Sequence, residues 1–401
     1  PSILQFWLSY IDALIKLNKI TDATGVIREA NVKGIKGKAF DQLRTRINKI
    51  GGTVEGADLE GESDDAGSKT QDPAPEQLQP LIDLYGQGQF DQVSDQVAGM
   101  LGEFPRSHTL FNLRGVAQSA LGKFDSAVES YKRAIEINPR YAKAYINMSV
   151  ALNNRGELDG AIKSCEEAIK IKPDFAEAYI NMGAALRDKG ELGAAIESYK
   201  QAIKIKPGDA EVHSNMGAVL KDNGELDAAI ESYKQALKIK PDYAEAYNNI
   251  GIVLQNKGEL DAAIESYKQA IKIKPDFAKF YYNMAIVLTE KGALEAAINI
   301  YKRALKIKPD FAHAYNNMGT VLKCKGDIDA AIKSYEQAIR IKPDFAEAFN
   351  NIGISLVANG QLVAAIANYK KAVKINPNSA EIYNNMGIAL QNKGELDAAM
   401  D

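Results

Sequence analysis

Cysteine is nearly absent from this chain of 401 residues, which contains only two. Two thiols exclude a disulfide scaffold and indicate a reducing compartment, so we expect a cytoplasmic protein. No Cys-x-x-Cys or His-Glu-x-x-His pattern occurs, and His108, His213 and His313 stand far apart, which argues against the common metal sites. We therefore predict no metal, no cofactor and two inert structural thiols, Cys165 and Cys324.

The sequence also has little excess of one charge sign over the other and no long apolar run. The net charge is −3, whereas a nucleic-acid binder normally carries a strong positive excess, so nucleic acid is not an expected partner. The apolar stretch at residues 2–17 is short and is interrupted by Asp12 and Lys16, so no membrane insertion is predicted. The phosphate-binding loops and nucleophile turns of common enzymes are missing as well, and we predict no enzyme within these residues.

Proline is sparse but regularly placed. Of the 13 prolines, nine follow one another at a constant spacing of 34 residues. A fixed period in this range is typical of a solenoid, in which one small unit is stacked many times. The nine are Pro105, Pro139, Pro173, Pro207, Pro241, Pro275, Pro309, Pro343 and Pro377.

We number each unit from the residue 31 places before its proline. Units 1 to 8 then cover 108–379, and a ninth unit, 380–401, stops after its first part. In the unit at 244–277, Tyr247, Ile250, Gly251 and Leu254 have the spacing of an amphipathic helix, and the pattern restarts after Gly258. Each unit is therefore predicted to be two helices joined at a glycine, position 15, that adopts the left-handed conformation.

The start of each first helix also carries a signal. An aspartate followed three residues later by a glutamate is typical of a capping box, as in Asp242 and Glu245. The same pair recurs as Asp174 with Glu177 and as Asp344 with Glu347. We therefore predict that these aspartates cap the first helices.

With its aromatic, glycine, alanine, tyrosine and proline positions at this period, the chain resembles the tetratricopeptide repeat proteins. The resemblance implies an all-α fold, a right-handed α-solenoid superhelix of stacked antiparallel helix pairs. Departures are few: Ser149 and Ala285 replace the first-helix glycine, His213 an aromatic residue and Cys165 the second-helix tyrosine.

Outside these units the pattern weakens. Residues 76–107 are predicted to be a degenerate capping repeat because Pro80 lies inside its first helix, and residues 1–50 a divergent helical hairpin followed by a short helix. Residues 51–75 carry seven acidic side chains against one lysine and little to bury, so we predict a disordered acidic linker, either a spacer or a partner-binding tail.

Function is expected to reside on surfaces. We predict a protein–protein interaction scaffold that binds extended peptide segments or partner proteins in the concave groove of the superhelix. The alternative is the substrate-recruiting arm of a transferase (glycosyl-, sulfo- or methyltransferase) whose catalytic domain follows Asp401. The missing initial methionine and the incomplete ninth unit favour a fragment of a longer protein; the oligomeric state is left open.

The clearest candidate for binding is an asparagine row at position 6 of eight successive units. In the family this face of the first helix lines the groove, and an amide can both donate to and accept from a peptide backbone. The row is similar to that of O-linked N-acetylglucosamine transferases, although asparagines here can also bridge neighbouring helices. Its members are Asn147, Asn181, Asn215, Asn249, Asn283, Asn317, Asn351 and Asn385.

Positions 9 and 12 flank the asparagine row. Position 9 adds an apolar strip, whose largest members are Ile252, Ile286, Ile354 and Ile388, and position 12 supplies the cations Arg187, Lys221 and Lys323. These cations are candidates for gripping acidic side chains or a carboxylate. Asp188 and Asp222 stand beside two of them, so ordinary surface ion pairs are the competing interpretation.

Overall fold

A computed structural model describes residues 72–394. The predicted hairpin and short helix of residues 1–50, the linker up to residue 71 and the end of the ninth unit, 395–401, lie outside the described residues.

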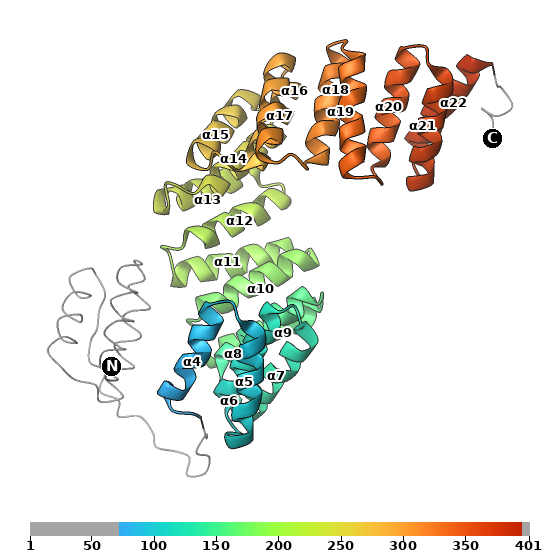
Figure 1. The fold of residues 1–401 in the computed structure, drawn as a ribbon. Coiled ribbons are helices and arrows are strands. Elements are labelled where there is room, and N and C mark those ends of the chain that lie inside the picture. Colours follow the sequence, from blue (N-terminus) through green and yellow to red (C-terminus); the bar gives the residue numbers. More distant parts are fainter. Residues whose placement is uncertain (1–71, 395–401) are drawn as a thin grey trace. The chain divides into compact units, whose positions relative to one another are not determined.

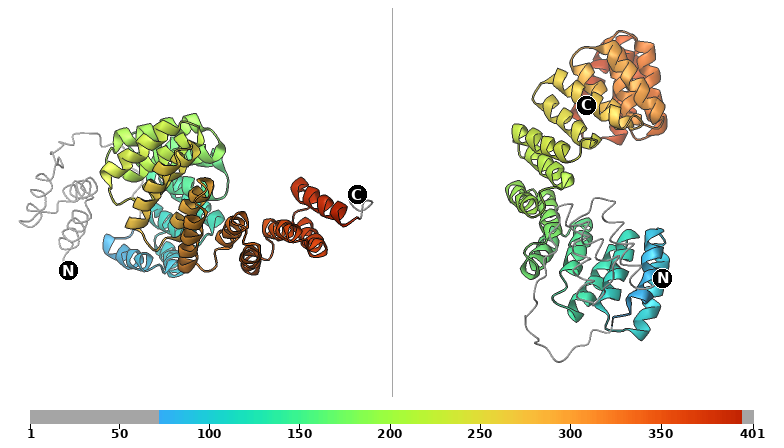
Figure 2. Two further views of the ribbon diagram at one scale, coloured as in Figure 1. Left: turned by 90° about the horizontal axis from the view of Figure 1, so that it is seen from above. Right: turned by 90° about the vertical axis from the view of Figure 1, so that its left-hand side faces the viewer.

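Within the described residues the fold is entirely helical and no strand occurs. Figures 1 and 2 show each helix lying beside the helices that precede and follow it along the chain. The elements are α4 (Pro75–Gly86), α5 (Phe90–Glu103), α6 (His108–Ala120), α7 (Phe124–Ile137), α8 (Ala142–Asn154), α9 (Leu158–Ile171), α10 (Ala176–Lys189), α11 (Leu192–Ile205), α12 (Ala210–Asp222), α13 (Leu226–Ile239), α14 (Ala244–Asn256), α15 (Leu260–Ile273), α16 (Ala278–Glu290), α17 (Leu294–Ile307), α18 (Ala312–Cys324), α19 (Ile328–Ile341), α20 (Ala346–Ala358), α21 (Leu362–Ile375) and α22 (Ala380–Lys393).

Each unit from 108 to 379 contributes one even-numbered first helix and one odd-numbered second helix, and consecutive helices pack against each other. The predicted all-α solenoid of stacked helix pairs is confirmed. Because the connections within and between units are short, each helix packs against the helices that precede and follow it in the sequence.

The turn within each unit depends on its glycine. At position 15 the backbone is left-handed, with φ of 76° at Gly258 and 86° at Gly190. The amide of Gly258 donates to the carbonyl of Gln255 at 2.9 Å, which closes the end of α14. Only glycine adopts this φ without steric cost, so the predicted glycine turns are confirmed.

The predicted capping boxes are wrong. Helix α14 begins after Tyr243, helix α10 after Phe175 and helix α20 after Phe345, and none of these starts has a side-chain cap. The aspartate of each Pro-Asp pair therefore lies one residue too early to reach the free amides. True side-chain caps occur at Ser107, which accepts from the amide of Leu110, and at Asp209.

The core of a unit forms where the position 8 glycine meets the position 24 tyrosine. A Cβ on Gly251 would lie only 2.7 Å from Cε1 of Tyr267, so the tyrosine ring occupies the space that a side chain would need. The tyrosines at position 24 are at most 2% exposed: Tyr131, Tyr199, Tyr233, Tyr267, Tyr301, Tyr335 and Tyr369. The glycine thus serves close helix approach, and the aromatic ring fills the gap.

Unit 2 departs at both of these positions together. Ser149 replaces the glycine and Cys165 the tyrosine, and both side chains are at most 1% exposed. Burial raises the pKa of the Cys165 thiol to about 11, against an opposing hydrogen bond from Ser149. A smaller second-helix residue therefore makes room for the larger first-helix residue.

Ion pairs connect the turns of successive units. A cation at position 14 reaches the acid at position 18 of the preceding unit, as in Lys257 with Asp227 at 2.7 Å. The pairing recurs in Arg155 with Asp125, Lys189 with Asp159, Lys291 with Asp261 and Lys325 with Glu295. It cannot form between units 3 and 4, where Gly193 and Asn223 occupy the two positions.

The segment before unit 1 is partly helical. Helix α4 continues through Pro80, and α4 packs on α5, so the predicted repeat at 76–107 contains a helix pair; its capping role stays a prediction. The end of the predicted linker needs a correction, because Asp72 accepts hydrogen bonds from the Ser107 hydroxyl and, at 3.3 Å, from the amide of Thr109. Residues 72–75 therefore belong to the folded array.

Replacing Ala263 by leucine should overpack the contact between the two helices of unit 5, because Ala263 is 0% exposed. We expect a loss of about 1–3 kcal/mol in the free energy of unfolding. Since units contact mainly their neighbours, amide exchange should accelerate in units 4 to 6 only. Uniform loosening from α6 to α21 would contradict this near-neighbour behaviour, and the exposed Ala262 replaced by leucine is the matched control.

Candidate binding face of the first helices

All eight members of the asparagine row lie on first helices and are half-buried. This position sits between the buried stripe of the helix and its exposed side, so the amide group can reach either a neighbouring helix or a ligand. The hydrogen bonds of each side chain decide between these two roles.

Five of the asparagines bridge to the preceding first helix. Nδ2 of Asn147 donates to Oδ1 of Asn112 at 2.9 Å, and Nδ2 of Asn317 donates to the hydroxyl of Tyr282 at 3.1 Å. The other three bridges, at 2.8–3.1 Å, are Asn283 to Asn248, Asn351 to Asn316 and Asn385 to Asn350. These amides serve the packing of adjacent units, which is the structural alternative considered above.

The remaining three asparagines make no such bridge. A bridge requires a polar residue at position 5 of the preceding unit, 35 residues upstream. For Asn181 and Asn215 that residue is Ile146 and Ile180, and neither amide makes a hydrogen bond within residues 72–394. For Asn249 the residue at that position is the polar Ser214, but no hydrogen bond joins the two within the described residues. Oδ1 of Asn249 accepts from Nδ2 of Asn248 at 3.3 Å, and Nδ2 of Asn249 has no partner among the described residues. We call Asn181, Asn215 and Asn249 the open amides.

A cavity of about 320 Å³ lies beside two of the open amides. Its walls come from α10, α12 and α14, with one residue from α13. The lining residues are Arg187, Ser214, Asn215, Ala218, Lys221, Tyr233, Asn249 and Ile252. Five residues predicted from sequence, at positions 6, 9 and 12, thus lie together: Asn215, Asn249, Ile252, Arg187 and Lys221.

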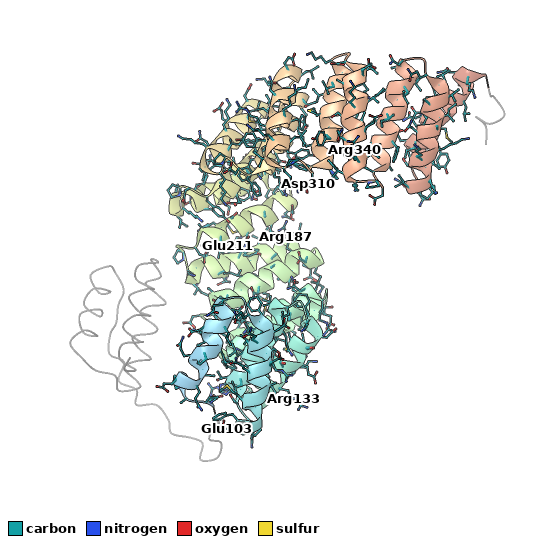
Figure 3. The ribbon with its side chains drawn as sticks, viewed as in Figure 1. Glu103, Arg133, Arg187, Glu211, Asp310 and Arg340 are labelled. Carbon is teal, nitrogen blue, oxygen red and sulfur yellow. The ribbon has the colours of Figure 1, made fainter. Side chains whose placement is uncertain are left out.

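The two cations at this cavity share one carboxylate. Arg187, labelled in Figure 3, donates through Nε at 2.9 Å and through Nη2 at 2.6 Å to Asp222, across the junction between units 3 and 4. Lys221 Nζ lies 2.9 Å from the other oxygen of Asp222. Burial raises the pKa of this carboxyl, but hydrogen bonds from Lys221 and Arg187 outweigh burial and lower it. The cluster therefore keeps one net positive charge.

The other predicted site residues do not join this cavity. Lys323 is half-buried on α18 and has no ion pair within the described residues, while Ile286, Ile354 and the 46% exposed Ile388 lie on α16, α20 and α22. They occupy the same helix positions in later units, where the neighbouring asparagines are bridged.

A second set of polar links was missed in the sequence. A donor at position 12 binds an acid at position 13 of the next unit, as in Arg187 with Asp222, Gln255 with Glu290 at 2.6 Å and Asn153 with Asp188 at 3.2 Å. The partner of Arg187 is thus the acid 35 residues onward and not the adjacent Asp188. These links can be found in the sequence by looking for an acid 35 residues after each donor at position 12.

His108, His313 and Cys165 have structural surroundings, whereas Cys324 is exposed on α18, so its predicted structural role is wrong. His313 stacks on Phe345 at 4.9 Å, His108 meets the Tyr141 ring edge-on at 4.7 Å, and Cys165 is buried. No group of three metal-binding side chains is found from residue 72 to residue 394. None of the helices in this range is long and apolar enough to cross a membrane.

Comparison with known proteins yields two family models. The one described as "Cilia and flagella-associated protein 70 C-terminal domain" matches residues 83–310, and the one described as "TPR repeat" matches residues 319–360 and 355–394. No curated protein matches the sequence.

Solved structures with similar folds include MamA, at 31% identity and a TM-score of 0.38, covering 41% of this chain and 96% of that one. They also include YrrB, titled a TPR protein with an unusual peptide-binding site, at 24% identity and a TM-score of 0.40, covering 50% and 99%. A tetratricopeptide repeat protein from Parabacteroides merdae is 19% identical with a TM-score of 0.49, covering 65% and 99%.

Proposed function

Because the chain belongs to the tetratricopeptide repeat family of the cilia and flagella-associated protein 70 C-terminal domain, we propose that it is an interaction scaffold that binds an extended peptide across α10, α12 and α14. The fold is typically non-catalytic, and we assign the described residues a role in binding partners. The observation that carries the proposal is the cavity of about 320 Å³ where two open amides and two cations meet.

The open amides suit a peptide backbone. An unbridged amide offers both a donor and an acceptor, which is what one backbone unit of an extended chain requires. An extended chain presents backbone amide and carbonyl groups along its whole length, so open amides on α10, α12 and α14 can each meet a backbone group of one peptide.

The flanking residues define which peptides fit. Ala218 and Ile252 give the cavity an apolar wall, and Arg187 with Lys221 leaves one positive charge after Asp222 is neutralised. A peptide with an acidic side chain near an aliphatic one matches both features. Such a carboxylate would contact Lys221 without displacing the two hydrogen bonds that Arg187 donates to Oδ2 of Asp222.

Replacing Asn181, Asn215 and Asn249 together by alanine should weaken peptide binding and leave stability nearly unchanged. Each lost hydrogen bond costs about 0.5–1.5 kcal/mol, so the affinity should fall about tenfold or more. The measurement is fluorescence anisotropy with peptides first selected from a displayed random library on the wild-type chain, with thermal melts alongside.

The bridged asparagines provide the matched control. Asn283, Asn317 and Asn351 replaced by alanine lose three inter-unit hydrogen bonds, so this variant should melt earlier and keep its peptide affinity. Equal affinity in both triple variants, or equal loss of stability, would show that the open amides have no binding role.

A further inference from the structure

A larger cavity lies on the opposite, second-helix side of the array. Its volume is about 580 Å³, it opens between α15 and α17, and residues of α16 form its floor. The inner surface is apolar: Ile264, Met284 and Leu288 are less than 10% exposed, and Ile300 is half-buried. The walls also carry two ion pairs, Asp261 with Lys291 and Glu265 with Lys268. Ligand sites typically measure about 300–1,000 Å³.

Two residues peculiar to unit 6 shape this cavity. Ala293 stands where units 2 to 5 carry glutamate, and Ile300 stands where those units carry serine, as in Glu259 and Ser266 of unit 5. The first change removes a charged side chain from the rim, and the second adds an aliphatic one to the wall. The cavity is therefore lined by the residues that set unit 6 apart from its neighbours.

Unit 6 also places an unpaired cation on the wall of this cavity. Arg303 lines the cavity, is exposed and forms no ion pair within residues 72–394. One turn earlier on α17, Asn299 stands where units 3 and 5 carry a glutamate. The two lysines of the lining, Lys268 and Lys291, are paired with Glu265 and Asp261.

We propose that this cavity is a second docking site, which takes a short acidic amphipathic helix from a partner protein. The lining residues run over about two helical turns of both α15 (Asp261 to Lys268) and α17 (Ala296 to Arg303), which matches two turns of a docked helix. Apolar side chains at positions i, i+3, i+4 and i+7 of the docked partner helix fill the cavity. A carboxylate of the docked helix contacts Arg303, which has no acidic partner within the described residues.

The test uses the full 401-residue chain and labelled model helices. One peptide of about 12 residues carries leucine at the four anchor positions and glutamate elsewhere; a second carries lysine in place of glutamate. We expect the glutamate peptide to bind, measured by fluorescence anisotropy, and the lysine peptide to bind at least about tenfold more weakly.

Substitutions borrowed from the neighbouring unit identify the site. Ala293→Glu combined with Ile300→Ser restores the unit 5 residues, so folding should be preserved while affinity falls about tenfold or more. Arg303→Gln, which introduces the residue found at Gln269, should reduce both the affinity for the glutamate peptide and its dependence on salt. Val363→Ser, which removes a 66% exposed valine on α21, should change nothing.

The outcomes separate this site from the open amides. The triple alanine variant of Asn181, Asn215 and Asn249 should bind the glutamate peptide normally. Equal binding by the wild type and the Ala293→Glu/Ile300→Ser variant would overturn the second site. Wild-type dimerisation that this variant abolishes, seen by analytical ultracentrifugation, would overturn it in favour of a second copy of the chain.

Discussion

Between pH 10 and pH 12 the protein should lose most of its free energy of unfolding. Burial raises the pKa of the position 24 tyrosines, to about 12 for Tyr131, Tyr199, Tyr335 and Tyr369, from the ordinary value of 10.0. Burial likewise raises the pKa of Tyr233, Tyr267 and Tyr301. The reason is that a phenolate cannot be solvated between two helices.

The direction of the pH dependence follows from the number of protons bound by the folded and the unfolded chain. Above pH 10 the unfolded chain releases phenolic protons that the folded chain still retains, so rising pH favours unfolding. The stabilisation is complete below pH 10 and is lost as the pH passes through the folded-state pKa. At pH 11 each such tyrosine lowers the free energy of unfolding by about 1.4 kcal/mol. The combined loss from seven tyrosines is comparable to the total stability of about 5–15 kcal/mol that is typical of a domain.

The measurement combines circular dichroism at 222 nm with tyrosinate absorbance in a pH titration. Helix loss and ionisation of the buried tyrosines should coincide in one step. Tyr233→Phe with Tyr369→Phe should move the midpoint to higher pH, because neither hydroxyl makes a hydrogen bond within the described residues and two ionisable groups are removed. Helices that persist while all tyrosines ionise would contradict the expectation.

Replacing Cys165 by tyrosine should destabilise unit 2 by about 3 kcal/mol, although tyrosine is the residue of the other units. In units 1, 3, 4, 5, 7 and 8 the ring lies against a glycine, and a Cβ there would be 2.5–2.9 Å from the nearest ring carbon; unit 6 has an alanine instead, without a hydroxyl. Ser149 places both a Cβ and a hydroxyl at this point. The tyrosine ring therefore has no space until residue 149 changes.

A graded series at residue 149 tests this explanation. Ser149→Gly combined with Cys165→Tyr recreates the pair of the other units and should recover most of the lost stability. Ser149→Ala with Cys165→Tyr copies unit 6, where Ala285 accompanies Tyr301, and should be intermediate. Urea unfolding of the single and double variants gives the coupling energy. Additive effects would show that the two positions do not share one space.

The repeat architecture was predictable because its determinants are local. A left-handed glycine ends each first helix and a proline follows each second helix, and both signals act within a few residues. The capping boxes failed because the N-cap residue is the aromatic residue at 243, 175 or 345 and not the aspartate before it. An aspartate one residue earlier then has no amide within reach.

The candidate site was predictable only in part. The asparagine row could be located from the period, but its division into bridged and open amides depends on a residue 35 places upstream, such as Asn248 for Asn283 and Ile180 for Asn215. Aligning the units at their period of 34 residues compares equivalent positions, whereas each bridge joins position 6 of one unit to position 5 of the preceding unit, 35 residues apart. The second-helix cavity was missed because Ala293 and Ile300 are single departures whose joint effect requires the packing of three helices.

The junction between units 3 and 4 has a mechanical consequence. It lacks the turn ion pair, since Gly193 faces Asn223, and it lacks the amide bridge, since Ile180 precedes Asn215; Arg187 with Asp222 remains as a polar link. We therefore expect the elastic compliance of the array to be concentrated there, so that a pulling force extends this junction first. A peptide bound across α10, α12 and α14 would span this junction and reduce its compliance, so peptide binding should increase the stiffness of the whole array.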